Sequence, residues 1–110
     1  MTCKQWDVVV VPFPFTNQPG AKRRPALVLS DRSFNVRGHS VLAMVTSSGR
    51  RPWPGDVALS DLKSAGLRAP CLVRLKLFTL DNRLLVKRIG RLSSVDRKQI
   101  EVQLQNYLPW

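Results

Sequence analysis

The chain has 110 residues, with 18 Lys and Arg against 7 Asp and Glu, and a formal net charge of +11 at pH 7. This length predicts one domain with a single core, residues 1–110, and no Pro-, Ser- or Gly-rich linker divides it. The charge excess predicts an acidic partner, which is nucleic acid, an anionic membrane surface or an acidic protein.

The apolar runs disfavour the membrane. None approaches the length of a spanning helix, and residues 1–11 lack the cleavage site and the apolar length of a signal peptide. We therefore expect a cytoplasmic protein. Cys3 and Cys71 suit that compartment as free thiols, and neither has metal-ligand spacing.

The first half of the chain predicts short strands separated by polar loops. Val8 to Val11 is β-branched throughout, which suits a strand, and Pro12 and Pro14 mark a sheet edge or a bend. The predicted strands are residues 6–15, 25–30, 39–46 and 56–59. The predicted polar connections are residues 16–24, 31–38 and 47–55.

A hairpin and a terminal helix complete the chain. Residues 71–79 alternate between two faces, which predicts a half-buried strand with a cationic outer side. The inner face is Val73, Leu75 and Leu77, and the outer face is Arg74, Lys76 and Phe78. A turn at residues 80–83 leads to a return strand, residues 84–89, that Gly90 breaks. Before the hairpin, Ser60 or Asp61 is expected to cap a brief helical turn ending at Gly66.

The last segment predicts a helix of three to four turns. Ser93-Ser94-Val95-Asp96 is a capping-box pattern with Asp in place of Glu, and Ile100, Leu104 and Leu108 follow on one face until Pro109. Short strands followed by one helix predict a mainly β protein, a strongly bent small barrel with the helix packed on one side.

Motifs in order along nearly the whole chain carry a family resemblance. They are Asp7-Val8-Val9, Pro14-Phe15, the Arg24-Pro25 step with residues 26–30, Thr46-Ser47-Ser48, residues 76–81, residues 87–93 and the terminal helix. Together they resemble the MazF/PemK toxins. The resemblance implies a homodimeric SH3-like barrel of the MazF/Kid/CcdB type with a short helix and a C-terminal helix. It also implies the toxin of a type II toxin–antitoxin system, a metal-independent endoribonuclease without a cofactor that cuts single-stranded RNA.

Two catalytic positions follow from the resemblance. The arginine of the family's Arg-Pro motif is Arg24, and the threonine at the end of the third strand is Thr46. The chain also departs from the family pattern, because Trp6 replaces a common glycine and Arg23 adds a second arginine beside the motif.

The residues themselves are compatible with this chemistry. RNA is cut without added water when its 2′-OH attacks the adjacent phosphorus. A two-histidine mechanism is excluded because His39 is the single histidine, and the seven acids are too scattered to hold a pair of metal ions. A cation-centred mechanism remains. Pro25 pushes Arg24 towards an extended backbone, and a guanidinium offers planar donors to a phosphate.

Further residues are candidates for the RNA path. They are Lys22, Arg23, Ser47, Ser48, Arg50, Arg51, Trp53, Arg74 and Lys76. Ser47 and Ser48 are also fallback hydroxyls for Thr46. Charge beside an aromatic platform at Trp53 suits single-stranded RNA, and a solvated loop is the alternative. Arg74 and Lys76 line either this groove or a dimer interface.

Two other functions compete with an RNA-cleaving toxin. One is a non-catalytic nucleic-acid-binding barrel, and the other is a toxin of the same fold that acts on a protein such as gyrase. The charge of +11 favours nucleic acid over a protein target, and Arg-Pro with a downstream threonine favours cleavage over binding. We also expect an acidic, partly disordered antitoxin in the same basic groove.

Overall fold

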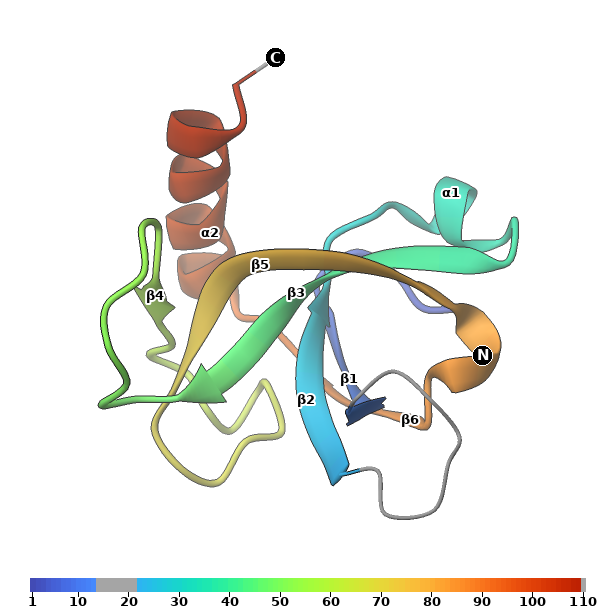
Figure 1. Cartoon of the computed structure of the whole chain (residues 1–110), viewed down its shortest axis with the longest axis horizontal. Coiled ribbons are helices and arrows are strands. Elements are labelled where there is room, and N and C mark those ends of the chain that lie inside the picture. Colours follow the sequence, from blue (N-terminus) through green and yellow to red (C-terminus); the bar gives the residue numbers. More distant parts are fainter. Residues whose placement is uncertain (14–21, 110) are drawn as a thin grey trace.

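The computed structural model describes residues 1–13 and 22–109 (Figure 1). The expectations for Pro14, Phe15 and the loop from Thr16 to Ala21 lie outside the described residues. Neither helix in the described ranges is long and apolar enough to cross a membrane.

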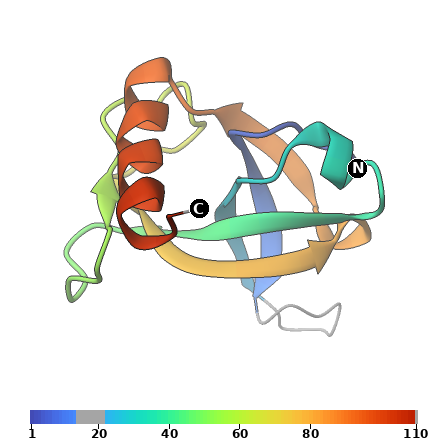
Figure 2. The same ribbon diagram turned by 90° about the horizontal axis from the view of Figure 1, so that it is seen from above.

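Six strands form one antiparallel sheet in the order β4-β5-β3-β2-β1-β6. Their bounds are Asp7–Phe13 for β1, Lys22–Val28 for β2, His39–Ser47 for β3, Val57–Ala58 for β4, Cys71–Asp81 for β5 and Lys87–Arg91 for β6. The sheet curls into a half-barrel, with β5 bending strongly along its length, and α2 (Ser94–Tyr107) stands at one side (Figures 1 and 2). The expected mainly β barrel with a terminal helix is confirmed.

Alternate side chains of the strands enter two hydrophobic clusters. On β1, Val8 joins the cluster that α2 covers through Ile100, whereas Val9 and Val11 join the second cluster. On β2, Leu27 belongs to the first cluster and its neighbours to the second. Successive side chains of a strand point to opposite faces, and each face of β1 and β2 packs against one of the clusters. Both faces of these strands are therefore apolar.

Trp6 lies just before β1 in a left-handed conformation, with φ of +75°. The strand therefore begins at Asp7 and not at Trp6 as expected. The backbone of Trp6 remains tied to its neighbours, because its N–H donates to the Val28 carbonyl at 2.8 Å and its carbonyl accepts from Leu92 N–H at 3.0 Å. Its side chain is buried in the first cluster. A bulky residue thus occupies a conformation that favours glycine.

The predicted inner face of β5 is wrong beyond Leu75. The β3–β5 register pairs Ala43 with Leu77 but Met44 with Arg74, so β5 contains two extra residues between these pairs. An even number of extra residues keeps the period of two, so Leu77 and Phe78 still lie on opposite faces, and it is Phe78 that packs against the second cluster. Leu77, expected inside, is 41% exposed.

Two short helical segments replace expected turns and loops. The polar connection contains α1 (Arg32–Asn35), and the hairpin turn is a 3-10 helix, η1 (Asn82–Leu84). Asn35 and Asn82 are buried, and the Asn82 amide donates to the Asn35 carbonyl at 2.6 Å. This hydrogen bond joins α1 to η1, which are distant in sequence.

The expected single turn capped by Asp61 and ending at Gly66 is confirmed: the Ala65 N–H donates to the Asp61 carbonyl at 3.4 Å, and Gly66 ends the turn with a φ of +75°. The Asp61 carboxylate caps this turn by accepting from the Ser64 N–H at 3.1 Å and hydroxyl at 2.7 Å. The turn packs against β6. Gly90 lies within β6 and does not break it, and a Cβ there would come within 2.3 Å of the Ala65 backbone.

The terminal helix begins as predicted but uses one residue differently. The Ser93 hydroxyl caps it by accepting from Asp96 N–H. The Asp96 carboxylate does not complete a capping box. It accepts from the Ser60 N–H and hydroxyl at 2.9 and 2.8 Å and from Asp61 N–H at 3.0 Å. Burial alone would raise the pKa of Asp96, but these hydrogen bonds hold it below the ordinary value.

Candidate active site

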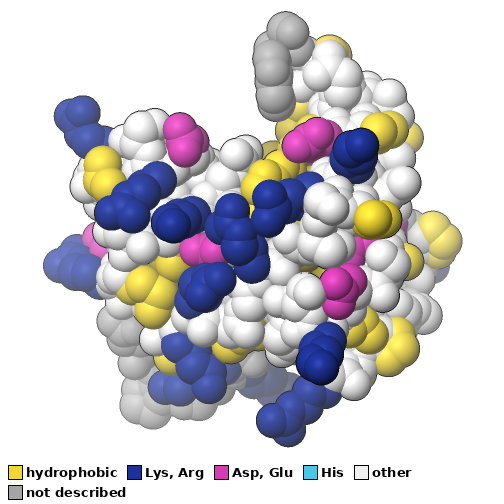
Figure 3. All heavy atoms as spheres, turned by 180° about the vertical axis from the view of Figure 1, so that it is seen from behind, with side chains coloured by type: hydrophobic (Ala, Val, Ile, Leu, Met, Phe, Trp, Pro, Cys, Tyr) yellow, Lys and Arg dark blue, Asp and Glu magenta, His cyan; other side chains and the backbone are white. Residues whose placement is uncertain are grey.

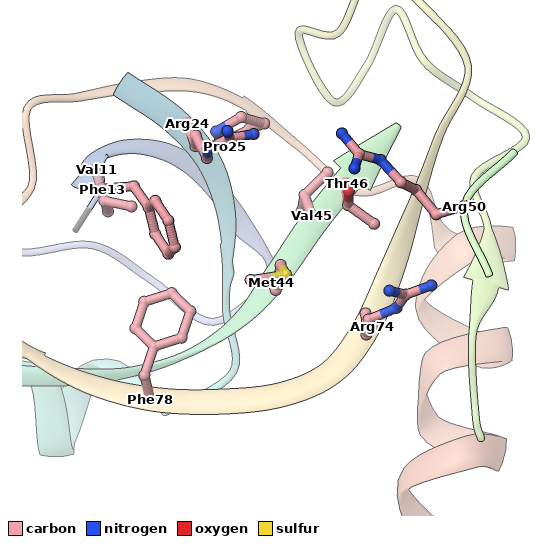
Figure 4. A pocket seen from close by; sticks show the side chains of 10 residues that line it. All are labelled: Val11, Phe13, Arg24, Pro25, Met44, Val45, Thr46, Arg50, Arg74 and Phe78. Carbon is pink, nitrogen blue, oxygen red and sulfur yellow. The ribbon is translucent and has the colours of Figure 1, made fainter. Parts of the chain in front are cut away.

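A pocket of about 220 Å³ opens among β1, β2, β3 and β5 (Figure 4). Its apolar lining comprises Val11, Phe13, Pro25, Met44, Val45 and Phe78. Its polar lining comprises Arg24, Thr46, Arg50 and Arg74. Figure 4 shows the two phenylalanine rings on one side and the Arg50 and Arg74 guanidinium groups on the other. The pocket therefore combines an apolar wall with a cationic wall.

Arg24 lies within β2, directly opposite Val11 of β1. The sequence-based boundary at Pro25 is wrong, because pairing with β1 continues to Lys22 opposite Phe13. The Arg24 guanidinium carbon lies 5.3 Å from the centre of the Phe13 ring. Contact with this ring restricts the guanidinium by a cation–π interaction, although the side chain is otherwise exposed.

Thr46 reaches the same pocket from β3. The β2–β3 ladder pairs Ala26 with Met44, and two further residues of this register bring Arg24 level with Thr46. Side chains opposite each other on neighbouring strands lie on one face, and both residues line the pocket. The structure therefore brings the two predicted catalytic residues together.

The hydroxyls next to Thr46 are arranged differently. Ser47 lies opposite Cys71, the backbone N–H of Ser48 donates to the Pro70 carbonyl at 3.1 Å, and neither serine lines the pocket. Burial raises the pKa of the Cys71 thiol, which makes it a poor nucleophile at neutral pH. Thr46 is thus the hydroxyl of this strand end that faces the pocket.

Arg74 uses most of its donors inside the protein. Its Nε and Nη2 donate to the two carboxylate oxygens of Asp56 at 3.1 and 3.0 Å, and Nη2 also donates to the Arg51 carbonyl at 2.8 Å. Its side chain is only 11% exposed. Arg74 therefore fixes the loop between β3 and β4 while it lines the pocket.

The same loop carries an aromatic platform. The Trp53 ring has the Arg74 guanidinium 5.8 Å and the Lys76 ammonium 4.8 Å from its centre. Lys76 and the ring remain exposed, whereas Arg50 turns back so that its Nε lies 3.5 Å from the Ser47 hydroxyl. A cation and an exposed ring side by side form a surface on which a base can stack.

Lys22 and Arg23 approach the pocket along β2 without lining it. They lie opposite Phe13 and Pro12 and are exposed. Asp7, by contrast, is buried and accepts from the Lys4 backbone N–H, from Arg88 Nε and from Arg91 Nη1. Asp7 therefore has a structural role, because one buried carboxylate holds two arginines.

Two features of the site were not predicted from the sequence: the apolar wall of the pocket and the acid that holds the loop before β4. Phe13 was treated only as part of a strand, although an apolar ring at a strand end before a basic loop is a usable signal. Asp56 was assigned to a strand, but it is the acid that orients Arg74. In residues 1–13 and 22–109, no three His, Cys, Asp or Glu side chains gather as a set of metal ligands.

The comparisons decide the family. The model of a family described as PemK-like, MazF-like toxin of type II toxin–antitoxin system matches residues 4–108. The chain belongs to this family. The resemblance to this family inferred from the sequence motifs is therefore confirmed.

Solved structures show the same MazF-like fold. A chain of a MazE–MazF crystal structure from Deinococcus radiodurans is 25% identical, with a TM-score of 0.76 over 98% of this chain and 97% of that chain. An endoribonuclease in complex with its cognate antitoxin, from a mycobacterial species, is 22% identical, with a TM-score of 0.76 over 98% of each chain. A MazF toxin of Mycobacterium tuberculosis is 19% identical, with a TM-score of 0.73 over 91% of this chain and 93% of that chain. No curated protein sequence matches the chain.

Proposed function

We propose that this protein is the toxin of a type II toxin–antitoxin system and a metal-independent, sequence-selective endoribonuclease. It cleaves single-stranded RNA, including mRNA, in the cytoplasm, and so inhibits translation and growth. The observation that carries the proposal is the meeting of Arg24 and Thr46 in one pocket from neighbouring strands. The family membership and the net charge of +11 support the same conclusion.

The pocket suits an internal transfer at phosphorus. The ribose 2′-OH attacks the adjacent phosphorus and loses its proton, the bond from phosphorus to the 5′ oxygen breaks, and the leaving oxygen gains a proton. The products are a 2′,3′-cyclic phosphate and a 5′-hydroxyl. Arg24 offers two N–H donors to the non-bridging oxygens as negative charge develops, and the Thr46 hydroxyl donates to one of them.

The RNA path follows the exposed cations around the pocket. The proposed contacts are Lys22, Arg23, Ser47, Ser48, Arg50, Arg51, Trp53, Arg74 and Lys76. Trp53 offers a stacking surface with Lys76 beside it. Arg74 contributes to the positive potential and positions the loop, because its guanidinium is already bound to Asp56.

Incubation of the purified protein with single-stranded RNA in EDTA tests the mechanism. We expect cleavage that leaves a cyclic phosphate, and its loss in Arg24→Ala. Arg37→Ala is the matched control, since Arg37 is exposed and does not line the pocket. Loss of cleavage in EDTA, or full activity of Arg24→Ala, would contradict this mechanism. Binding of RNA without any cleavage would favour a non-catalytic nucleic-acid-binding barrel.

We further propose an acidic, partly disordered antitoxin that covers the same cationic wall. Solved MazE–MazF complexes are among the similar structures. An antitoxin on Arg24 and Arg50 would exclude RNA by charge and by volume. Co-expression with an acidic antitoxin that forms a stable complex with this protein should restore growth, and growth arrest that persists despite such a complex would contradict a shared site.

A homodimer is the proposed assembly. Leu77 on β5 and Val102, Tyr107 and Leu108 at α2 leave apolar side chains in solvent. Light scattering should give twice the chain mass of 12.4 kDa. A mass of one chain at all concentrations would exclude the dimer.

A further inference from the structure

A second cationic pocket lies away from the candidate active site. Its charged lining is Lys4, Asp31, Arg32, Arg91 and Arg97, with Trp6 behind them. It lies beside the first residue of β1, whereas the candidate active site is lined by Val11 and Phe13 at the other end of the strand. The six residue steps of β1 separate the two pockets by about 20 Å, at about 3.3 Å per residue.

The pocket belongs to a wider basic surface. Figure 3 shows many Lys and Arg side chains gathered across the back of the molecule, with a smaller number of acidic side chains among them. β6 contributes Arg88 and Arg91, both partly exposed. Four cations and one acid line the pocket itself, so it carries a positive excess.

Several of these cations are oriented by the protein but have donors to spare. Buried Asp7 holds Arg88 by Nε and Arg91 by Nη1, each at 3.0 Å, so one carboxylate serves two guanidinium groups. Arg97 is anchored by Nε to the Leu92 carbonyl at 3.0 Å, which leaves its two terminal nitrogens for another acceptor. Anchored guanidinium groups lose less entropy when they bind an anion.

Two further cations, Lys4 and Arg32, are not paired with any group in the described part of the chain. Within residues 1–13 and 22–109, neither the Lys4 ammonium nor the Arg32 guanidinium has a hydrogen-bond or ion-pair partner. The nearby acid is already occupied, because the Asp31 carboxylate accepts from Arg32 N–H at 2.7 Å and from the Ser33 hydroxyl at 2.9 Å. Lys4 and Arg32 are therefore available to an external anion.

We propose that this pocket binds backbone phosphates of the RNA substrate at a distance from the cleaved bond. The inference rests on the proposed function and adds a second contact region, so that long RNA binds more tightly than short RNA. An acidic protein is the less favoured ligand, because protein interfaces are centred on buried apolar anchors and Trp6 is only 7% exposed. Phosphates need only cations at spaced positions.

The dimensions set the length of RNA required. The two pockets lie about 20 Å apart along β1. Roughly six stacked nucleotides, at about 3.4 Å each, are needed to span that distance. An RNA of about 3 nucleotides can therefore fill only one pocket, whereas an RNA of about 30 nucleotides can reach both.

The test compares these two RNA lengths by fluorescence anisotropy, with Arg24→Ala as the background so that RNA is not cut. The variant is Lys4→Gln with Arg32→Gln. The control, Arg37→Gln with Arg83→Gln, removes the same two charges at exposed positions that line neither pocket. We expect the variant to bind long RNA several-fold more weakly, with a log–log salt slope shallower by about 1.4, or about 0.7 per lost phosphate contact. Short RNA should bind as before.

Each alternative outcome is distinct. Unchanged affinity for long RNA, or an equal loss for both lengths or in the control, would overturn the second site. A loss of binding to poly-glutamate without a loss for long RNA would also overturn it, in favour of an acidic protein. Failure of the unmodified protein to bind or cut any RNA would instead refute the proposed function, whereas normal cleavage of short RNA by Lys4→Gln with Arg32→Gln in a protein that keeps Arg24 would leave that function intact.

Discussion

Arg74 and Asp56 are joined by two hydrogen bonds, from Nε to Oδ1 at 3.1 Å and from Nη2 to Oδ2 at 3.0 Å. The two side chains are 11% and 17% exposed. Asp56 also accepts from Trp53 N–H at 3.0 Å, so one ion pair holds β5, the loop after β3 and its aromatic platform together. This pair converts a basic loop into a fixed wall of the pocket.

Asp56→Ala should therefore destabilise the protein and release this loop. The lost partner leaves a mostly buried guanidinium unpaired, at a cost of about 2 kcal/mol in the free energy of unfolding. Urea denaturation measures the loss. Arg83→Ala is the control, because it breaks an ion pair with Asp81 through a side chain that is 90% exposed and should change stability little. An equal loss in both variants would show that the Asp56 pair has no special role.

Trp6 should reveal the strain of its left-handed backbone. Trp6→Ala and Trp6→Gly both remove the buried ring, at about 3 kcal/mol, but only glycine relieves the conformation, by about 1 kcal/mol. We expect the order of stability Trp6, then Gly, then Ala in urea denaturation. An alanine variant as stable as the glycine variant would mean that φ at this position changes when the ring is removed.

Asp96 should make the helix junction sensitive to acid. The hydrogen bonds from Ser60 and Asp61 hold its pKa in the folded state below the ordinary value of an aspartate. The hydrogen bonds of the carboxylate therefore stabilise the fold above that value, and the contribution is lost as the pH falls through the lower folded pKa. Asp96→Asn should be less stable at pH 7 and should lose less stability on acidification. Glu101→Gln, on the exposed side of α2, should follow the original protein across the titration.

Thr46→Val should lower the single-turnover rate of RNA cleavage by about 10²-fold, since it removes one donor to the phosphoryl oxygens. Thr46→Ser should restore most of the rate. The exposed Thr79 on β5 provides a matched control as Thr79→Val. A rate that Thr46→Val leaves unchanged would remove Thr46 from the proposed mechanism.

Local patterns were sufficient to predict most of the fold. The β-branched run before Pro12 predicted β1, and the spacing of Ile100 and Leu104 predicted the buried face of α2. Leu108, expected on the same face, is 38% exposed, because α2 ends at Tyr107 and the chain then leaves the core. The spacing of apolar residues therefore predicts the buried face of a helix only as far as the helix extends.

The parts that could not be predicted depend on contacts between distant segments. The bulge in β5 is set by pairing with β3, which no local pattern in residues 71–79 encodes. Asp96 fits a capping box locally, but it serves Ser60 and Asp61, 36 and 35 residues earlier in the chain. Arg24 and Thr46 could be named from motifs, whereas the Phe13 ring beside Arg24 required the β1–β2 register.

The contact of β6 with the preceding turns has a consequence for genetics. A Cβ at Gly66 would lie 2.0 Å from the Ile89 carbonyl oxygen, and one at Gly90 would lie 2.3 Å from the Ala65 backbone. Most point changes at either glycine must therefore disrupt folding, far from any chemistry. In a screen for survivors of toxin expression, both positions should recur beside Arg24, and only the amount of soluble protein would separate these misfolded escapees from catalytically dead ones.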